Sequence, residues 1–236
     1  YYMVTGDEDF MERCGYELIL DTAKFWASRL EEGEDGKLHI NDVVGPDEYK
    51  EHVDDNAFTN HMAAWNIRKA LEYCGLHRSE KPAHYKALDE KLGHAALEPV
   101  WEDKLSRLYL PQPREDLVIP QDRTYLTLKD IDLTKYKKQE NVGSTYRDYN
   151  QEQITHIQVS KQADILIMFL LLEDQFSAEV KAANWNYYEP RTLHDSSLSL
   201  STHCILAGDM GNREMAYELF QKAAAIDVGP NMKTSD

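Results

Sequence analysis

Apolar residues recur at three- and four-residue steps along most of the chain, which is the spacing of one face of an α-helix. The first stripe runs from Phe10 to Leu30. Later stripes cover residues 58–71, 85–92, 99–108, 160–174, 177–185, 196–207 and 213–226. The pattern predicts an all-α protein.

Glycines and short polar residues predict several helix ends. The first helix is expected to end near Gly33, because glycine commonly follows the last turn of a helix. Asp54 or Asp55 is a suitable N-cap for the helix over 58–71, and Gly75 is expected to close that helix. The apolar run 165–172 is shorter than the roughly 20 residues of a membrane helix, so we interpret it as a core helix.

Residues 109–150 break the helical pattern. Pro111, Pro113 and Pro120 stand among scattered aspartates, tyrosines and lysines. Connections between packed helices are usually about 2 to 8 residues long, so a connection of this length is expected to be functional or mobile. We find no other candidate boundary and treat residues 1–236 as one domain.

Charge and cysteine content exclude several classes of protein. The net charge of −16 repels phosphate backbones and anionic lipid, so neither nucleic acid nor a membrane is an expected partner. Cys14, Cys74 and Cys204 are too far apart for a CxxC motif and fit the reduced thiols of a cytoplasmic protein. The histidines lack zinc spacing and no calcium loop occurs, so no metal is predicted.

The most informative segment runs from Gly45 to Asn60. A Gly-Pro pair stops regular structure and presents the next side chains from a loop. Asp47 and Glu48 are adjacent, so only one of them is expected to face a given substrate. Aromatic rings, amides and carboxylates together are typical of a sugar-binding cleft, since rings pack on sugar faces while polar groups bind hydroxyls.

Three separated segments resemble glycoside hydrolase family 65, whose members are mostly inverting disaccharide phosphorylases. The segments are Gly45 to Tyr49 with Asp54 to Asn60, Lys161 to Asp164, and Thr192 to Ser199. The resemblance implies that the chain is an incomplete part of an (α/α)6 barrel. An upstream Trp-Asp segment and a downstream Gly-Ile-His segment of the family are not in this sequence. The isolated chain is therefore expected to be inactive.

The resemblance implies that Glu48 is the general acid. An inverting hydrolase pairs such an acid with a second carboxylate that activates water. Phosphate is already an anionic nucleophile, so a phosphorylase can use an anion pocket instead of that base. Glu48 must carry its proton near neutral pH, which partial burial or a nearby negative charge, such as bound phosphate, would favour.

Other matched residues imply binding roles, each with a structural alternative. Lys161 and Gln162 match a pair that contacts the sugar, although they could equally be an ordinary first helical turn. Asn56 and Asn60 could bind sugar hydroxyls or belong to a polar helix start. For phosphate the candidates are Ser196, Ser197 and His194, expected at a helix N-terminus where free N–H groups favour an anion. Plain N-capping by Asp195 or Ser196 is the alternative.

The resulting expectation is a cytoplasmic phosphorylase similar to maltose phosphorylase. It would cleave an α-glucosyl disaccharide with inorganic phosphate to give β-glucose 1-phosphate and a sugar. Phosphate is a co-substrate and no cofactor is expected. The expected partners are the disaccharide and phosphate, with a homodimer of the complete protein as an option. A family hydrolase that uses water and a non-catalytic helical scaffold are the alternatives.

Overall fold

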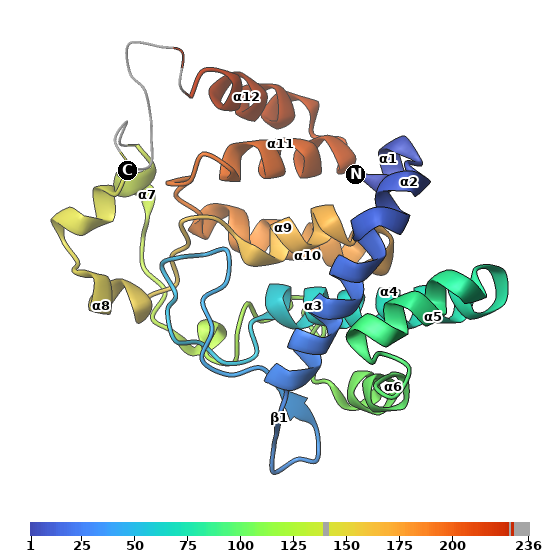
Figure 1. The fold of residues 1–236 in the computed structure, drawn as a ribbon. Coiled ribbons are helices and arrows are strands. Elements are labelled where there is room, and N and C mark those ends of the chain that lie inside the picture. The colour runs from blue at the N-terminus through green and yellow to red at the C-terminus, as the bar shows by residue number, and fades with distance from the viewer. Residues whose placement is uncertain (139–141, 227, 229–236) are drawn as a thin grey trace. The chain divides into compact units, whose positions relative to one another are not determined.

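The computed structural model describes residues 1–138, 142–226 and 228. Two compact units are distinguished, and helices dominate both of them (Figure 1). The first unit comprises Tyr1–Ile40 and Thr59–Leu110, and the second comprises Asn41–Phe58 and Pro111–Asp236. The predicted all-α class is confirmed.

The first unit contains most of the N-terminal helices. They are α1 (Tyr2–Thr5), α2 (Glu8–Phe10), the π-helical turn η1 (Met11–Gly15), α3 (Tyr16–Arg29), α5 (Pro82–Leu92), α6 (Glu98–Arg107) and residues 59–80 of α4 (Ala57–Glu80). A short antiparallel hairpin joins β1 (Glu31–Glu32) to β2 (Leu38–His39). Because β1 follows Leu30, α3 ends at Arg29, earlier than the predicted end near Gly33.

One hydrophobic core joins the helices of the first unit. The buried residues of α3 are spaced by four, three and four positions: Tyr16, Leu20, Ala23 and Ala27. Helices α4, α5 and α6 add Ile67, Ala70, Cys74, Leu88 and Trp101. Leu18 and Phe25, from the stripe that predicts this helix, are 62% and 53% exposed. The alanines leave room for a neighbouring helix to approach closely. The buried face of α3 therefore carries smaller residues than the apolar stripe predicts.

Helix α4 does not end at Gly75 as predicted. It continues to Glu80, and a Cβ on Gly75 would meet no heavy atom within 4 Å. Burial of Cys74 and His77 on the helix outweighs the cost of an internal glycine, which is about 1 kcal/mol.

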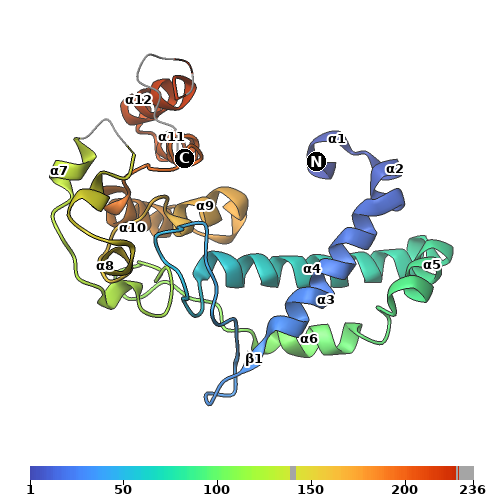
Figure 2. The same cartoon turned by 60° about the vertical axis from the view of Figure 1, so that its left-hand side comes forward.

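The second unit holds the remaining elements. They are η2 (Tyr125–Thr127), α7 (Thr134–Lys137), η3 (Ser144–Arg147), α8 (Gln151–Thr155), α9 (Asp164–Leu171), η4 (Glu173–Gln175), α10 (Ala178–Tyr188), η5 (Glu189–Arg191), α11 (Ser199–Asp209) and α12 (Arg213–Ala224). Figure 2 shows α11 and α12 packed side by side. In the described part of the chain, no helix has both the length and the apolar character that a membrane span requires.

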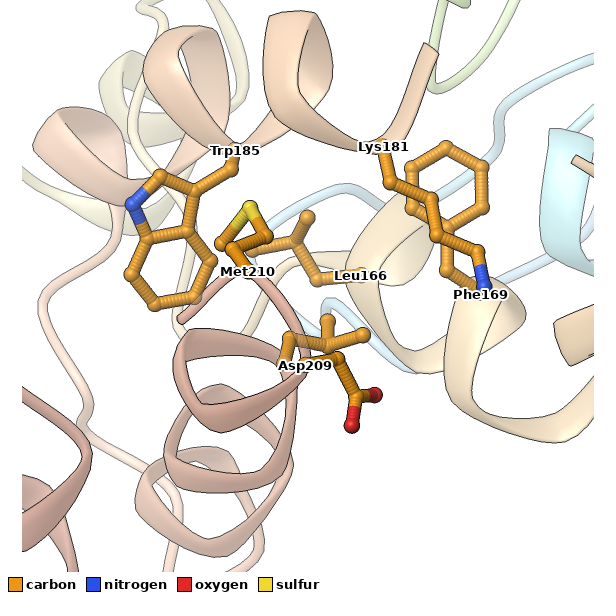
Figure 3. Close-up of a pocket in the computed structure, with 7 residues that line it drawn as sticks. Leu166, Phe169, Lys181, Trp185, Asp209 and Met210 are labelled. Atoms are coloured by element: carbon orange, nitrogen blue, oxygen red, sulfur yellow. The ribbon is translucent and has the colours of Figure 1, made fainter. Parts of the chain in front are cut away.

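Helices α9, α10 and α11 pack on one another around an apolar contact. Leu166 and Phe169 come from α9, Trp185 comes from α10, and Met210 follows α11 (Figure 3). The space between these side chains holds about 10 Å³, at most one water molecule. This contact is core packing, which agrees with the predicted core helix over 165–172.

The predicted connection 109–150 contains three short helices, η2, α7 and η3, and residues 139–141 of it lie outside the described residues. Leu133 and Tyr136 from this segment pack in a second core with Tyr49, Ile154 and Leu193. The segment thus supports the loop that carries Tyr49.

Candidate active site

The segment from Gly45 to Lys50, here called the acid loop, begins at a glycine with no room for a side chain. A Cβ on Gly45 would lie 2.2 Å from Asp164 Oδ2 and 2.5 Å from Asn56 Nδ2. Those two groups are buried and hydrogen-bonded to each other over 2.6 Å. Since neither can move freely, glycine is required here by close approach.

Replacing Gly45 with alanine is expected to lower the free energy of unfolding by about 1–3 kcal/mol, the usual cost of overpacking a buried site. Urea unfolding measures this loss. The matched control is Gly208→Ala in α11, where the added Cβ meets no heavy atom within 4 Å; its stability should be unchanged or slightly higher. Equal losses of unfolding free energy in Gly45→Ala and Gly208→Ala would contradict the requirement for glycine at position 45.

Two buried aspartates lock the acid loop to the start of α9. The Asp47 N–H donates to Asp164 Oδ1 over 2.5 Å. In return, Asp47 Oδ1 accepts from Lys161 N at 2.8 Å and from Tyr49 N at 3.3 Å. Asp47 Oδ2 accepts from Gln121 Nε2 at 3.0 Å. The backbone before Glu48 is therefore held by the distant Asp164, and the backbone after it is held by the neighbouring Asp47.

Burial perturbs the ionisation of this pair. It raises the pKa of Asp164 well above its usual value, and the nearby Asp47 raises it further. Burial also raises the pKa of Asp47, against the Lys50 ammonium, which lowers it. Lys50 is 2% exposed and donates to the carbonyls of Ile154 and Ile157 over 2.7 and 2.9 Å. Burial lowers the pKa of Lys50, although Asp47 opposes this shift.

Glu48 projects from the acid loop towards Lys161. Its Oε2 accepts from Lys161 Nζ over 2.5 Å, and its side chain is 63% exposed. Glu48 is therefore mostly exposed among the described residues, and its charged neighbour is a cation rather than an anion. Lys161 and Gln162 lie just before α9, which begins at Asp164, so the alternative that they form an ordinary first helical turn is wrong.

Gln162 is buried beside the acid loop and retains an open acceptor. Its Nε2 donates to the Pro46 carbonyl over 2.6 Å. Its Oε1 has no hydrogen-bond partner within the described residues. Because buried polar atoms are normally paired, this oxygen is an acceptor whose hydrogen bond is not made among the described residues.

Tyr49 connects the acid loop to the third motif. Its hydroxyl donates to Asp195 Oδ2 over 2.7 Å. Burial, followed by the Asp195 carboxylate, raises the pKa of Tyr49 above its usual value. The backbone N–H of Asp195 donates to the Lys161 carbonyl over 3.2 Å, and Ser160 pairs with Thr192 in a parallel bridge. The acid loop, Lys161 and the segment Thr192–Asp195 therefore meet within the second unit.

The predicted helix start at His194–Ser197 is wrong, because α11 begins at Ser199. A turn comes first: the Ser199 N–H donates to the Ser196 carbonyl over 3.1 Å, and the Leu198 N–H donates to Ser196 Oγ over 3.3 Å. Ser196 is buried, whereas Ser197 is exposed. These residues thus present a turn ahead of the helix, and α11 has no side-chain N-cap bond.

Both ring nitrogens of His194 contact protein groups. Nδ1 lies 2.9 Å from Ser199 Oγ, and Nε2 lies 3.3 Å from Glu189 Oε1. Burial lowers the pKa of His194 to about 4, although the hydrogen bond to Glu189 raises it. The imidazole is therefore neutral near pH 7.

The two asparagine candidates have different surroundings. Asn56 is buried in the second unit and donates to Asp164, so it supports the acid loop. Asn60 is buried in the first unit, where its Nδ2 donates to the Tyr109 carbonyl over 2.8 Å. Asp54 and Asp55, the expected N-caps of the helix over 58–71, both pair with Arg123.

Sequence reasoning missed the residues that hold the acid loop. The sequence assigns Asp47 no role beyond its place beside the general acid, and it marks Asp164 and Tyr49 only as parts of motifs. One signal was present: Asp164 stands directly before the apolar run 165–172. An acid at the head of a buried helix needs a polar partner.

Among the described residues, two groups of side chains are close enough to hold a metal ion. They are Cys74 with His94 and Glu98, and Glu189 with His194 and His203. In the first group Arg78 pairs with Glu98, and in the second Lys137 Nζ lies 3.7 Å from Glu189 Oε1. Each carboxylate thus has a cationic partner already, which favours a hydrogen-bonded network over a metal centre.

Comparison with known proteins gives matches over the whole chain. The sequence model of the glycosyl hydrolase family 65 central catalytic domain matches residues 1–236. A kojibiose phosphorylase from Halothermothrix orenii is 42% identical over 239 residues, which cover 100% of this chain and 30% of the relative. A kojibiose phosphorylase from Escherichia coli K12 is 37% identical, with 100% of this chain and 29% of the relative covered.

A more distant relative and a solved structure agree with these matches. A maltose phosphorylase from Bacillus subtilis is 32% identical, covering 97% of this chain and 29% of its own length. A solved structure described as a candidate kojibiose phosphorylase from the human microbiome has a TM-score of 0.83 and 30% identity. The match covers 96% of this chain and 31% of that one. The chain therefore spans about 30% of the length of the relatives it matches.

Proposed function

Because this chain belongs to glycosyl hydrolase family 65, we propose that it supplies the acid loop and part of the sugar and phosphate contacts of an inverting phosphorylase. The substrate is an α-glucosyl disaccharide and the nucleophile is inorganic phosphate. The observation that carries the proposal is the 2.5 Å contact between Glu48 and Lys161, two residues from separate motifs.

In the proposed reaction Glu48 donates its proton to the glycosidic oxygen as the bond from that oxygen to C1 breaks. A phosphate oxygen attacks C1 from the opposite face, so the configuration inverts. The products are β-glucose 1-phosphate and a sugar with a new hydroxyl group. The phosphate dianion takes the place of the second carboxylate that an inverting hydrolase needs.

In the proposed scheme, binding of the substrates replaces the hydrogen bond between Glu48 and Lys161. In this structure Lys161 Nζ donates a hydrogen bond to Glu48 Oε2. Sugar hydroxyls and phosphate oxygens compete for the Lys161 N–H groups, and the phosphate charge favours the protonated acid. The open Gln162 Oε1 accepts from a sugar hydroxyl in this scheme.

For phosphate, the proposal assigns direct contacts to Ser196 and Ser197, which lie in the turn before α11. His194 has protein partners on both nitrogens, so its proposed role is to shape that turn. Asn56 supports the acid loop through Asp164, and Asn60 remains a candidate for a sugar hydroxyl.

The test is a product assay on the full-length enzyme that carries this segment. Kojibiose is the first disaccharide to use, because the relatives at 42% and 37% identity are named kojibiose phosphorylases; maltose, trehalose and nigerose follow. We expect ³¹P and ¹H NMR to show β-glucose 1-phosphate in phosphate and no cleavage in phosphate-free buffer. Cleavage without phosphate would identify a hydrolase, and no cleavage of any sugar would favour a binding scaffold.

A further inference from the structure

Glu189 lies between two histidines at the junction of α10 and α11. Its Oε1 is 3.3 Å from His194 Nε2, and its Oε2 is hydrogen-bonded to His203 Nδ1. The two imidazole rings are edge-to-face, with centroids 4.6 Å apart. The side chains of Glu189, His194 and His203 are 14%, 12% and 1% exposed. This Glu189 cluster is therefore largely shielded from water.

The cluster determines which ring nitrogen carries each proton. An ionised carboxylate only accepts hydrogen bonds, so His194 is protonated at Nε2 and His203 at Nδ1. Burial raises the pKa of Glu189, but the hydrogen bonds from His194 and His203 outweigh burial and lower it below its usual value. Since His194 is neutral near pH 7, its Nδ1 has a free lone pair and accepts from Ser199 Oγ.

The backbone next to this cluster is strained. His194 has φ of 55°, in the left-handed region that residues with a Cβ rarely adopt. The strained turn is held on one side by Asp195, which accepts from the Tyr49 hydroxyl. On the other side it is held by Ser199, whose N–H donates to Ser196. Such strain persists only where the surroundings over-determine the conformation, and it is concentrated at functional sites.

We propose that Glu189 is a positioning residue that holds His194 in its Nε2–H tautomer and thereby fixes the turn carrying Ser196 and Ser197. This inference rests on the proposed function for its link to phosphate, whereas the tautomer assignment rests on the contacts and on the neutral state of His194. Glu189 acts through His194 and Ser199 and does not touch a substrate.

The Glu189 cluster differs from ordinary apolar core packing in how much it contributes to stability. A buried carboxylate with two imidazoles is no more stabilising than an apolar core of the same volume unless all its hydrogen bonds are made. The charged and titratable groups that face Glu189 are His194, His203 and Lys137, and Lys137 Nζ also donates to the Glu189 carbonyl over 2.6 Å. What the arrangement provides is one defined geometry of the turn.

The first experiment measures the tautomers directly. Ring ¹⁵N shifts of histidine-labelled protein should show His194 protonated at Nε2 and His203 at Nδ1, with assignments from His194→Gln and His203→Gln. In Glu189→Gln the amide N–H₂ replaces one acceptor oxygen, so one of the two histidines must change its tautomer. Protonation of wild-type His194 at Nδ1, or unchanged tautomers in the variant, would overturn the assignment.

The second experiment connects the cluster to phosphate in the full-length enzyme. Glu189→Gln is expected to raise the KM for phosphate about tenfold, the effect of weakening one charge-assisted contact, with the KM for the disaccharide changed less than about twofold. The control Glu214→Gln alters an exposed acid in α12 and should leave both constants unchanged. An equal rise in both KM values would mark a merely structural residue and refute the proposal. Activity without phosphate in the wild type would refute the proposed function and leave the tautomer result standing.

Discussion

Glu48→Gln in the full-length enzyme is expected to lower kcat for the natural disaccharide by about 10²- to 10⁴-fold, the usual contribution of a general acid. Glutamine can still accept from Lys161 Nζ, so the contact that holds the side chain is kept. It cannot deliver a proton to the departing oxygen. Steady-state kinetics with saturating phosphate measure the loss, and circular dichroism checks that the variant is folded.

A substrate with a good leaving group separates proton donation from general damage. The 4-nitrophenolate of a 4-nitrophenyl α-glucoside departs as a stable anion and needs little protonation. The kcat of Glu48→Gln for this substrate should therefore fall by less than about tenfold. The matched control is Glu51→Gln, which neutralises an exposed acid just after the acid loop. It should leave turnover unchanged. Near-normal turnover of the natural disaccharide by Glu48→Gln would refute the role of Glu48.

Asp47→Asn is expected to reduce the free energy of unfolding by roughly 3 kcal/mol at pH 7. The carboxylate accepts from Lys161 N, Tyr49 N and Gln121 Nε2. An amide has only one acceptor oxygen, so its NH₂ group must face one of these donors. The substitution also leaves the buried Lys50 ammonium without the carboxylate that most strongly favours its charged form. Urea unfolding measures the loss.

Asp164→Asn tests the pH dependence of the same network. Because burial raises the pKa of Asp164 above its usual 3.8, the native state binds more protons than the unfolded state above that pH. Unfolding free energy therefore falls as pH rises through the window above 3.8. Asparagine has no titrating proton, so the unfolding free energy of this variant should fall less with rising pH than that of the wild type, as urea unfolding across this window measures.

The control for both aspartates is Asp42→Asn, whose side chain is 74% exposed and whose stability should change by less than about 0.5 kcal/mol. A fall in stability with rising pH that is as large in Asp164→Asn as in the wild type would contradict the raised pKa of Asp164.

The helices were predictable to the extent that their signals are local. Helical periodicity depends on contacts three and four residues apart, so the stripes over 85–92, 99–108 and 213–226 correspond to α5, α6 and α12. The predictions at Gly75 and at His194–Ser197 were wrong for one reason. A glycine or a serine has only a small local preference, and packing or a preceding turn outweighs it.

The sequence by itself determined the all-α class, the family resemblance and the three motifs, because each depends on residue types at short spacing. Only the tertiary structure decided which atoms of those motifs meet. Glu48 and Lys161 are 113 residues apart, and Tyr49 and Asp195 are 146 apart. Such contacts depend on how whole helices and loops pack, and no local pattern encodes them. The same packing buries Asp47 and Asp164 and exposes Glu48, which lies directly after Asp47.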